Sequence, residues 1–479
     1  MKKSLFSLIF VFIVLLGGCA TQSPEVTTEP TVTESAIAGT AGPEYQPYAG
    51  SLENYTYYYA DGRDLKWEED VLYTAEVFLG KTSLHGHPLL VNEDVQILFA
   101  MSSASMDYRP FYDEALRAQF LQDINDLIPR ITELEDEQIL LALQKAIAKL
   151  GDLNSYVHSP AEQVYPIFFT TFFTDRGAEI RSVMMPEEYS QLLLKKPVSI
   201  NGTPIVEVTQ KLMEYISHEN EYAANYFISQ FLSQPAYLEA IGITDGEAPV
   251  SFRFLDAEGK KVDVSLSPVK YADLQMDSLT GYSSVSIRDK DNSRNYWWEY
   301  LQEEQALYIR FNLIEEDSSL VYSNFIQQLR EQVPQAKMVI VDLRGTTGGS
   351  FHSGLSIDLG SLLNQLKEQK SYVLLDASSN SAAILLSSCL RQRSANTVLV
   401  GTPGGQPANF FTSFESYNMP NSDHGFSMSD FFWFSDENDT NEALMPDIEL
   451  YQTAEDFAAG IDTVLETILS GNLPPIKIS

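Results

Sequence analysis

The chain has 479 residues and a formal net charge of −35 at pH 7, because 66 acidic residues face 31 basic ones. This balance disfavours binding to nucleic acid or to an anionic membrane surface, since both carry negative charge themselves. The length suffices for two or three domains with a sizeable hydrophobic core, so the fold does not need disulfides.

The N-terminus has the pattern of a secretory signal. Lys2 and Lys3 precede an apolar stretch that is too short to span a membrane and that ends in small residues. The four residues Leu16 to Cys19 resemble the bacterial lipobox, which implies that Cys19 is lipidated and becomes the new N-terminus. The alternative is an ordinary signal with a chance cysteine. We expect a signal peptide over 1–18 and a lipid-anchored protein on the extracytoplasmic face of the cell membrane.

The next two segments differ in their capacity to fold. Residues 19–50 are rich in Thr, Pro, Glu and Gly and lack apolar periodicity, so we interpret them as a disordered tether. Residues 51–165 carry helical patterns such as "DEQILLALQKAIAKL", in which Ile139, Leu143 and Ala146 share one helix face. We therefore expect a helical N-terminal region after the tether.

The middle of the chain, residues 166–290, has a mixed pattern. "PVSINGTPIVEV" predicts two strands joined by an Asn201-Gly202 turn. "EAPVSFRFLDAEGKKVDVSLSPV" predicts a second hairpin around Glu258-Gly259. Helix-like segments lie between the two hairpins, so this region is expected to be a mixed α and β module.

The last region, residues 291–479, alternates strands with helices. "ALYIRFNLI", "KMVIVDLRG", "SYVLLDA" and "NTVLVG" are strand-like, and helical patterns lie between them. This alternation predicts crossover units around a largely parallel sheet, and hence an α/β fold. Cys389 falls in an apolar helical run, where we interpret it as a packed thiol.

Two bends in this region carry residues suited to chemistry. In "LLDASSNSAAILL", Ser381 stands where a polar bend becomes a helix, as either a nucleophile or a helix cap. In "VIVDLRGTTGGSFHSG", Gly348 and Gly349 would let backbone N–H groups approach a ligand closely. Such a bend suits a developing oxyanion, while the lysine of the phosphate-loop pattern is absent. The alternative is a tight strand-to-helix turn.

Five segments in register resemble the tail-specific, or C-terminal processing, peptidases, and in particular their tricorn-like branch. These segments are "VDLRGTTGG", "LLDASSNSAAILL", "VLVGTPGGQP", "MPDIEL" and "EDFAAGIDTVLE". The resemblance covers most of residues 66–470. It implies an α/β crotonase-like serine-peptidase core over 291–479 and a PDZ-like module over 166–290. It implies a peptide or protein substrate and no cofactor.

The resemblance also assigns roles to individual residues. Ser381 stands at the position of the nucleophile, and Gly348 and Gly349 stand at the oxyanion-binding bend. The backbone N–H of Ala382 would be a further oxyanion donor.

The residues that should activate the serine are substituted. A serine hydroxyl is a poor nucleophile until a base removes its proton. Gln406 stands where one branch of the family has a lysine base. Asn154 stands where the other branch has a histidine, and Ser413 falls at about the position of the glutamate that orients it.

Three nearby residues are candidate substitutes. His158 follows Asn154 by four positions, which is ~13 Å along a strand. His352 directly follows the oxyanion bend. Glu415 lies two positions, or ~6.6 Å, beyond Ser413 and is the candidate orienting residue.

No metal site is expected. His85 and His87 form a pair in "LHGHP" without an acidic or thiol ligand set beside them. The acidic segment 435–442, "SDENDTNE", lacks the spacing of a calcium loop and is typical of a solvated turn.

Two hypotheses follow. The first is a membrane-anchored serine peptidase that acts through Ser381 with an unconventional base. The second is a pseudoprotease that binds a peptide or protein partner with the same fold. A histidine nitrogen within hydrogen-bond reach of the Ser381 hydroxyl favours the enzyme, and a pocket lined by Asn154, Ser413 and apolar groups favours the binding protein.

Overall fold

The computed structural model describes much of the chain in detail. The described residues are 57–84, 114–158, 162–245, 248–256, 258–275, 279–281, 286–366, 369–433, 435 and 439–476. The predicted signal peptide and tether, with Cys19, lie outside them, as do His85 and His87. Among the described residues no helix has the length and apolarity needed to cross a membrane.

The largest sheet has six strands in the order β11-β12-β13-β14-β15-β18. All neighbours pair in parallel except β11 with β12. This confirms the predicted α/β class with a largely parallel sheet. The strands are β11 (Tyr296–Leu301), β12 (Ala306–Phe311), β13 (Met338–Asp342), β14 (Lys370–Leu375), β15 (Thr397–Gly401) and β18 (Ile448–Glu449).

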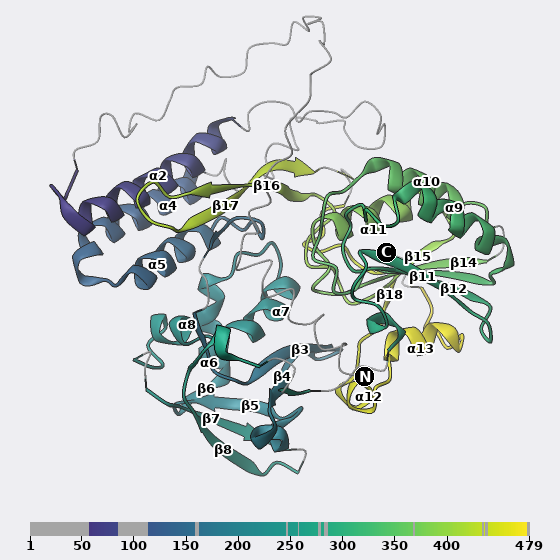
Figure 1. The fold of residues 1–479 in the computed structure, drawn as a ribbon, viewed down its shortest axis with the longest axis horizontal. Coiled ribbons are helices and arrows are strands. Elements are labelled where there is room, and N and C mark those ends of the chain that lie inside the picture. Colours follow the sequence, from purple (N-terminus) through teal and green to yellow (C-terminus); the bar gives the residue numbers. More distant parts are fainter. Residues whose placement is uncertain are drawn as a thin grey trace, which may run out of the picture.

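Helices cover both faces of this sheet, so its inner strands are largely buried and mostly apolar (Figure 1). In β12, Leu307 and Ile309 pack against one set of helices, and Tyr308 packs on the opposite face. Cys389 is buried in the same apolar cluster as Leu307 and Ile309, as predicted, and burial raises the pKa of its thiol to about 11. The helices are α9 (Tyr322–Gln332), α10 (Ser353–Leu363) and α11 (Ala382–Arg393) on that side, and α13 (Thr463–Leu469) on the other.

The middle region has a four-stranded sheet of order β6-β5-β7-β8. Both predicted hairpins are confirmed by pairing of β5 with β6 and of β7 with β8. Asn201 and Gly202 both have positive φ, as a two-residue hairpin turn requires. The strands are β5 (Lys196–Ile200), β6 (Thr203–Pro204), β7 (Val250–Leu255) and β8 (Lys261–Leu266).

The prediction of the second strand of the first hairpin is wrong in part. After two residues of β6, the segment that begins at Ile205 forms a helix rather than a strand. Val208 and Leu212 are spaced by four and both are buried, so helical rather than alternating periodicity governs the segment. The helices here are α6 (Ile205–Leu212), α7 (Glu221–Phe231) and α8 (Pro235–Ala240).

A second sheet, of order β10-β4-β3, lies between this module and the six-stranded sheet (Figure 1). Its strands are β3 (Phe168–Thr174), β4 (Gly177–Pro186) and β10 (Leu279–Gly281), and β2 (Gln163–Val164) pairs with β9 (Val269–Lys270). The remaining short helices are α12 (Ala454–Ala459) and 3₁₀ turns at Ile128–Glu133, Glu187–Leu192, Met213–Tyr215, Tyr271–Asp273, Ile287–Asp289 and Val333–Gln335.

The N-terminal helices share their core with a hairpin from the far end of the chain. Phe411, Phe426 and Met428 of the hairpin are buried with Trp67 and Phe78 of the helices. Figure 1 shows this hairpin extending from the six-stranded sheet to the helical region. The elements are α2 (Gly62–Leu84), α4 (Glu114–Leu127), α5 (Asp136–Ala148), β1 (Tyr156–His158), β16 (Phe410–Asn418) and β17 (Gly425–Trp433).

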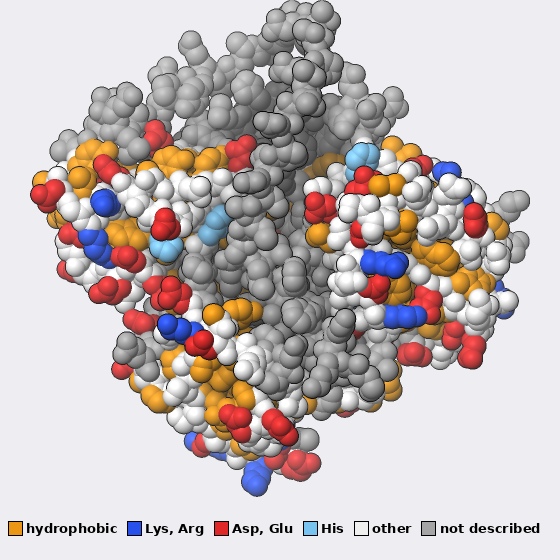
Figure 2. Space-filling view, in the orientation of Figure 1, with side chains coloured by type: hydrophobic (Ala, Val, Ile, Leu, Met, Phe, Trp, Pro, Cys, Tyr) orange, Lys and Arg blue, Asp and Glu red, His pale blue; other side chains and the backbone are white. Residues whose placement is uncertain are grey.

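The surface agrees with the acidic composition. On the face that Figure 2 shows, acidic side chains of the described residues are widely spread and basic ones lie scattered among them. The described residues on this face form no extended basic patch of the kind that binds nucleic acid.

Candidate active site

Ser381 occupies a strained turn between β14 and α11. Its φ is +50° and its ψ is −121°, and its side chain makes no capping hydrogen bond to the helix. An L-residue in such a conformation costs on the order of 1–3 kcal/mol. A strained residue between a strand and a helix is the geometry that presents a nucleophile at the top of a sheet. Of the two roles that the sequence allows for Ser381, nucleophile or helix cap, the side chain therefore does not act as the cap.

The bend before Ser381 is held against the glycine-rich bend that follows β13. Gly345 N donates to Asp376 Oδ1 at 3.1 Å, and Asn380 N donates to the carbonyl of Thr346 at 3.3 Å. The two bends consequently lie side by side.

Both glycines of that bend sit where a side chain would not fit. At Gly348, with φ of +127°, a Cβ would lie 3.0 Å from Ser381 Cβ and 3.4 Å from Ser381 Oγ. At Gly349 a Cβ would lie 2.3 Å from the carbonyl oxygen of Ile314. The structure thus brings Gly348 against the serine and places Ala382 next in the chain, as the first residue of α11. Their roles as oxyanion donors remain predictions.

The Ser381 hydroxyl has a hydroxyl partner. Its Oγ lies 3.2 Å from Oγ1 of Thr412, a buried residue of β16. A threonine hydroxyl is a donor and acceptor but is no base near neutral pH. Among the described residues, no histidine, lysine or carboxylate hydrogen-bonds Ser381 Oγ.

Two of the substituted positions meet beside the serine. The fully buried Gln406 accepts a hydrogen bond from Ser381 N at 2.5 Å through Oε1. Its Nε2 lies 3.4 Å from the Phe411 carbonyl, to which Asn154 Nδ2 donates at 2.9 Å. Ser413 lies two residues further along β16, and only its backbone is described. The structure therefore gathers Asn154, Gln406 and Ser381 into one hydrogen-bonded cluster.

A pair of acidic residues, missed in the sequence, adjoins this cluster. Glu219 Oε1 accepts from Gln406 Nε2 at 2.7 Å, and its Oε2 is buried without a partner among the described residues. Burial, and then the charge of Asp152, raise the pKa of Glu219 well above its usual range. Burial also raises the pKa of Asp152, although Ser155 and Ser429 donate hydrogen bonds to it. The surroundings thus shift the pKa of both carboxyls in the direction of the uncharged form.

The sequence held a signal for only one of these acids. Asp152 lies two positions before Asn154, in the segment that resembles the family's Asp-x-His-Thr motif. Glu219 stands in "SHENE" with no motif around it, and its importance arises from a contact 187 residues away in sequence.

The structure does not bring His158 to the serine. His158 pairs with Gly425 of β17, whereas Thr412 pairs with Phe431, six residues along the same strand. At ~3.3 Å per residue this separation is ~20 Å. His158 Nε2 instead lies 2.7 Å from Ser427 Oγ, and burial lowers its pKa.

The other two candidate substitutes, His352 and Glu415, have different partners as well. His352 is exposed, and its Nδ1 caps α10 by accepting from Gly354 N at 3.1 Å. Glu415 is exposed on β16 and accepts from the hydroxyl of Tyr417. No described group of histidine, cysteine and acidic residues could hold a metal ion.

Solved structures resemble this chain at the level of the fold. Mature CPAF complexed with lactacystin matches with a TM-score of 0.54 and 12% identity, over 84% of this chain and 98% of that one. Mature CPAF alone gives a TM-score of 0.54 and 12% identity, over 85% and 100%. The chain therefore shares the overall fold of CPAF.

A further similarity is weaker. The photosystem II D1 C-terminal processing protease has 12% identity over 70% of this chain and 88% of that one, with a TM-score of 0.34, too low to carry an argument. No protein-family model and no curated protein matches the chain.

Proposed function

We propose that this chain is a serine-peptidase-like protein that binds a peptide or protein chain at the Ser381 site and hydrolyses it slowly or not at all. The observation that carries this proposal is the hydroxyl partner of Ser381, Thr412 Oγ1 at 3.2 Å, in a cluster where Gln406 and Asn154 replace the family's bases. Removing a member of a serine-base unit costs roughly 10⁴- to 10⁶-fold in rate.

The retained part of the site supports binding. The glycine bend lies against Ser381, and the first N–H groups of α11 have no partner within the helix. In this proposal, N–H groups of Gly348, Gly349 and Ala382 receive a carbonyl oxygen of the bound chain. Peptide recognition then survives the loss of the base.

Active peptidase chemistry is the second candidate, and the strain at Ser381 favours it. Strained backbone persists where the surrounding structure over-determines it, and such residues cluster at active sites. For this candidate, His158 or His352 would serve as base with Glu415 as orienting residue, which requires movement from their places in the structure.

The proposal includes a place in the cell and a division of the chain. A lipid on Cys19 and a tether over 19–50 would hold the protein at the extracytoplasmic face of the membrane. The division is a helical region over 51–165, a PDZ-like module over 166–290 and a crotonase-like core over 291–479. Growth with radiolabelled palmitate tests the anchor: label in the wild type should disappear in Cys19→Ala.

A fluorophosphonate probe tests the Ser381 site. We expect wild-type protein, purified in detergent, to be labelled no faster than Ser381→Ala across neutral and alkaline pH, because no base activates the hydroxyl. Labelling that is lost in Ser381→Ala would contradict this and establish an activated serine. The variants His158→Ala and His352→Ala would then identify the base, with Thr412→Val as the control that removes the observed hydroxyl partner.

A further inference from the structure

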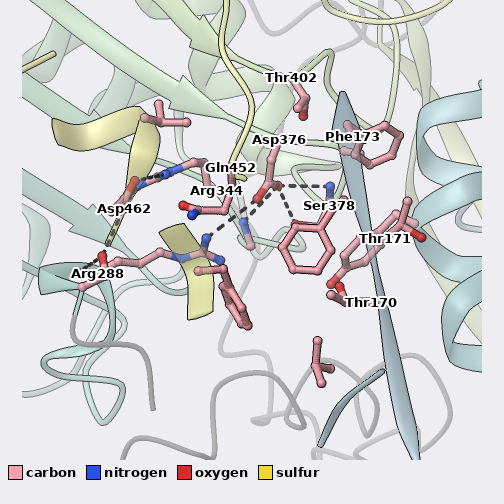
Figure 3. A pocket seen from close by; sticks show the side chains of 18 of the residues that line it. Thr170, Thr171, Phe173, Arg288, Arg344, Asp376, Ser378, Thr402, Gln452 and Asp462 are labelled. Carbon is pink, nitrogen blue, oxygen red and sulfur yellow. Dashed lines mark hydrogen bonds and ion pairs between the residues drawn. The ribbon is translucent and has the colours of Figure 1, made fainter. Parts of the chain in front are cut away.

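A cavity of about 250 Å³ lies beside the Ser381 site, at the carboxyl ends of the parallel strands (Figure 3). Gly345 after β13, Ser378 after β14 and Thr402 after β15 line one wall, and β3 lines the other. Ligands of open parallel sheets bind at this edge. The volume is below the ~300–1,000 Å³ of typical small-molecule pockets, which suits one or two side chains of a longer ligand.

Part of the cavity lining is aromatic and aliphatic. Apolar side chains from β3, β4, the end of β14, the residue after β18 and α12 contribute to it, so an apolar group could be enclosed from several sides. They are Phe172, Phe173, Val183, Leu375, Leu450 and Phe457.

Arg288 supplies hydrogen-bond donors that lack acceptors. Its Nε is buried without a partner among the described residues, and its Nη1 is 3.9 Å from Asp376 Oδ2, beyond hydrogen-bond distance. Its Nη2 lies against Gly345, where a Cβ would be 2.2 Å away. A guanidinium has five N–H donors, and leaving them unpaired inside a pocket is unfavourable. A ligand with an acceptor would satisfy them.

The charge of the lining indicates an uncharged acceptor. Asp289, Asp376 and Asp462 line the cavity against only two cations, Arg288 and Arg344. Arg344 is already bonded to Asp462 at 2.7 Å, as Figure 3 shows. A ligand carboxylate would therefore meet an excess of negative charge, whereas a backbone carbonyl would not.

The cavity lies within reach of a chain bound at Ser381. Gly345 precedes Gly348 by three residues, and Ser378 precedes Ser381 by three, in two bends that lie side by side. Three residues of extended chain span at most ~10 Å.

We propose that this cavity is a specificity subsite for an apolar side chain of a bound peptide, about three residues from the carbonyl held at Ser381. Arg288 donates to a backbone carbonyl of that peptide. The inference rests on the proposed peptide-binding function and adds the substrate class, an extended chain with a large apolar residue at one fixed position.

Fluorescence anisotropy with the full chain in detergent tests the subsite. The probes are labelled peptides with both ends blocked, built of alanine and glutamine with one phenylalanine moved along the sequence. We expect tighter binding by about tenfold or more for one phenylalanine position than for the peptide without it. We expect Phe173→Ala and Arg288→Met each to remove most of that gain, while Arg330→Met, an exposed arginine on α9, keeps it.

The outcomes separate the two proposals. Binding of all peptides alike, unchanged in Phe173→Ala and Arg288→Met, would overturn the subsite and leave the proposed function standing. Absence of binding by any peptide would overturn both. Tighter binding of a peptide with a free C-terminal carboxylate, dependent on Arg288, would overturn the assignment of a neutral carbonyl. Thermal unfolding that matches the wild type verifies that each variant is folded.

Discussion

The protein buries two groups of carboxylates in opposite electrostatic surroundings. Asp342 and Asp462 share the guanidinium of Arg344, at 2.6 Å and 2.7 Å. Burial alone would raise the pKa of both acids, but the charge and hydrogen bonds of Arg344 hold them below their usual range. Asp152 is also buried, as is the carboxyl group of the otherwise half-buried Glu219, and there burial raises the pKa.

The difference lies in the cation. With Arg344 present, burial yields an ionised pair that ties β13 to the start of α13. With no cation among their described partners, Asp152 and Glu219 have raised pKa values, and Glu219 is linked to Ser381 through Gln406. Perturbed titration without a compensating ion pair is typical of functional sites. The comparison therefore separates a structural group from the candidate site by charge alone.

Removal of Arg344 should have the largest effect on stability. Arg344→Met removes the guanidinium that both carboxylates share and leaves Asp342 only the more distant Arg310, at 3.8 Å, so we expect a loss of about 3–5 kcal/mol in the free energy of unfolding. Urea denaturation at neutral pH measures it, with the exposed Arg330→Met as the control. A loss below ~1 kcal/mol would show that this ion pair does not hold the two elements together.

Asp462→Asn should have a smaller and pH-dependent effect. It removes charge-assisted bonds to Arg344, for which we expect about 1.5–3 kcal/mol at pH 7. Because the folded-state pKa of Asp462 is lowered, its contribution is full above the unfolded value of ~3.9 and is lost as pH falls below that. Wild type and variant should therefore converge in acid, and parallel denaturation curves from pH 6 to pH 2 would disprove it.

Glu219→Gln should raise stability relative to the wild type, whereas Asp462→Asn lowers it. Since the folded-state pKa is raised, the stability linked to this acid is full below ~4.3 and is lost as pH rises through the folded-state value. The amide avoids this loss, so the variant should gain on the wild type as pH rises, by about 1.4 kcal/mol for each unit of raised pKa. Glu214→Gln, at an exposed surface pair, serves as control. A gain that does not depend on pH would indicate that Glu219 is ionised in the folded state.

Ser381→Gly should reveal the backbone strain at the Ser381 site. Glycine adopts positive φ freely, so we expect Ser381→Gly to be more stable than Ser381→Ala by about 1 kcal/mol, after glycine's own entropic cost. Thermal unfolding of the two variants gives the difference. Equal stabilities would mean that the turn relaxes at little cost.

Local sequence patterns were sufficient to predict several features of the fold. Strand and helix alternation predicted the parallel sheet, and the Asn201-Gly202 pair predicted its hairpin because both positions need positive φ. The segment from Ile205 was misjudged because a short apolar run fits either period. Ser381 was picked out correctly as the junction of bend and helix, but its strain is a property of the folded backbone.

Features that depend on distant contacts were beyond sequence reasoning. Glu219 becomes a buried acid only through Gln406, and Arg288 becomes an unpaired donor only through the cavity around it. The displacement of His158 from the serine follows from the register of β1 on β17, which no local signal encodes. Residue type and spacing indicate which groups are present, whereas tertiary register decides which of them meet.

The core shared by α2 and the β16–β17 hairpin can form only after the hairpin has been synthesised. Asn421 N donates to Asp70 Oδ1 at 2.9 Å across 351 residues of chain, and Phe426 completes the apolar core around Phe78. At ~5–20 residues per second, the ribosome needs roughly 20–70 s to supply that hairpin after α2. The apolar side chains of α2 that pack on the hairpin, such as Phe78, therefore stay uncovered by it until residues 410–433 have been made.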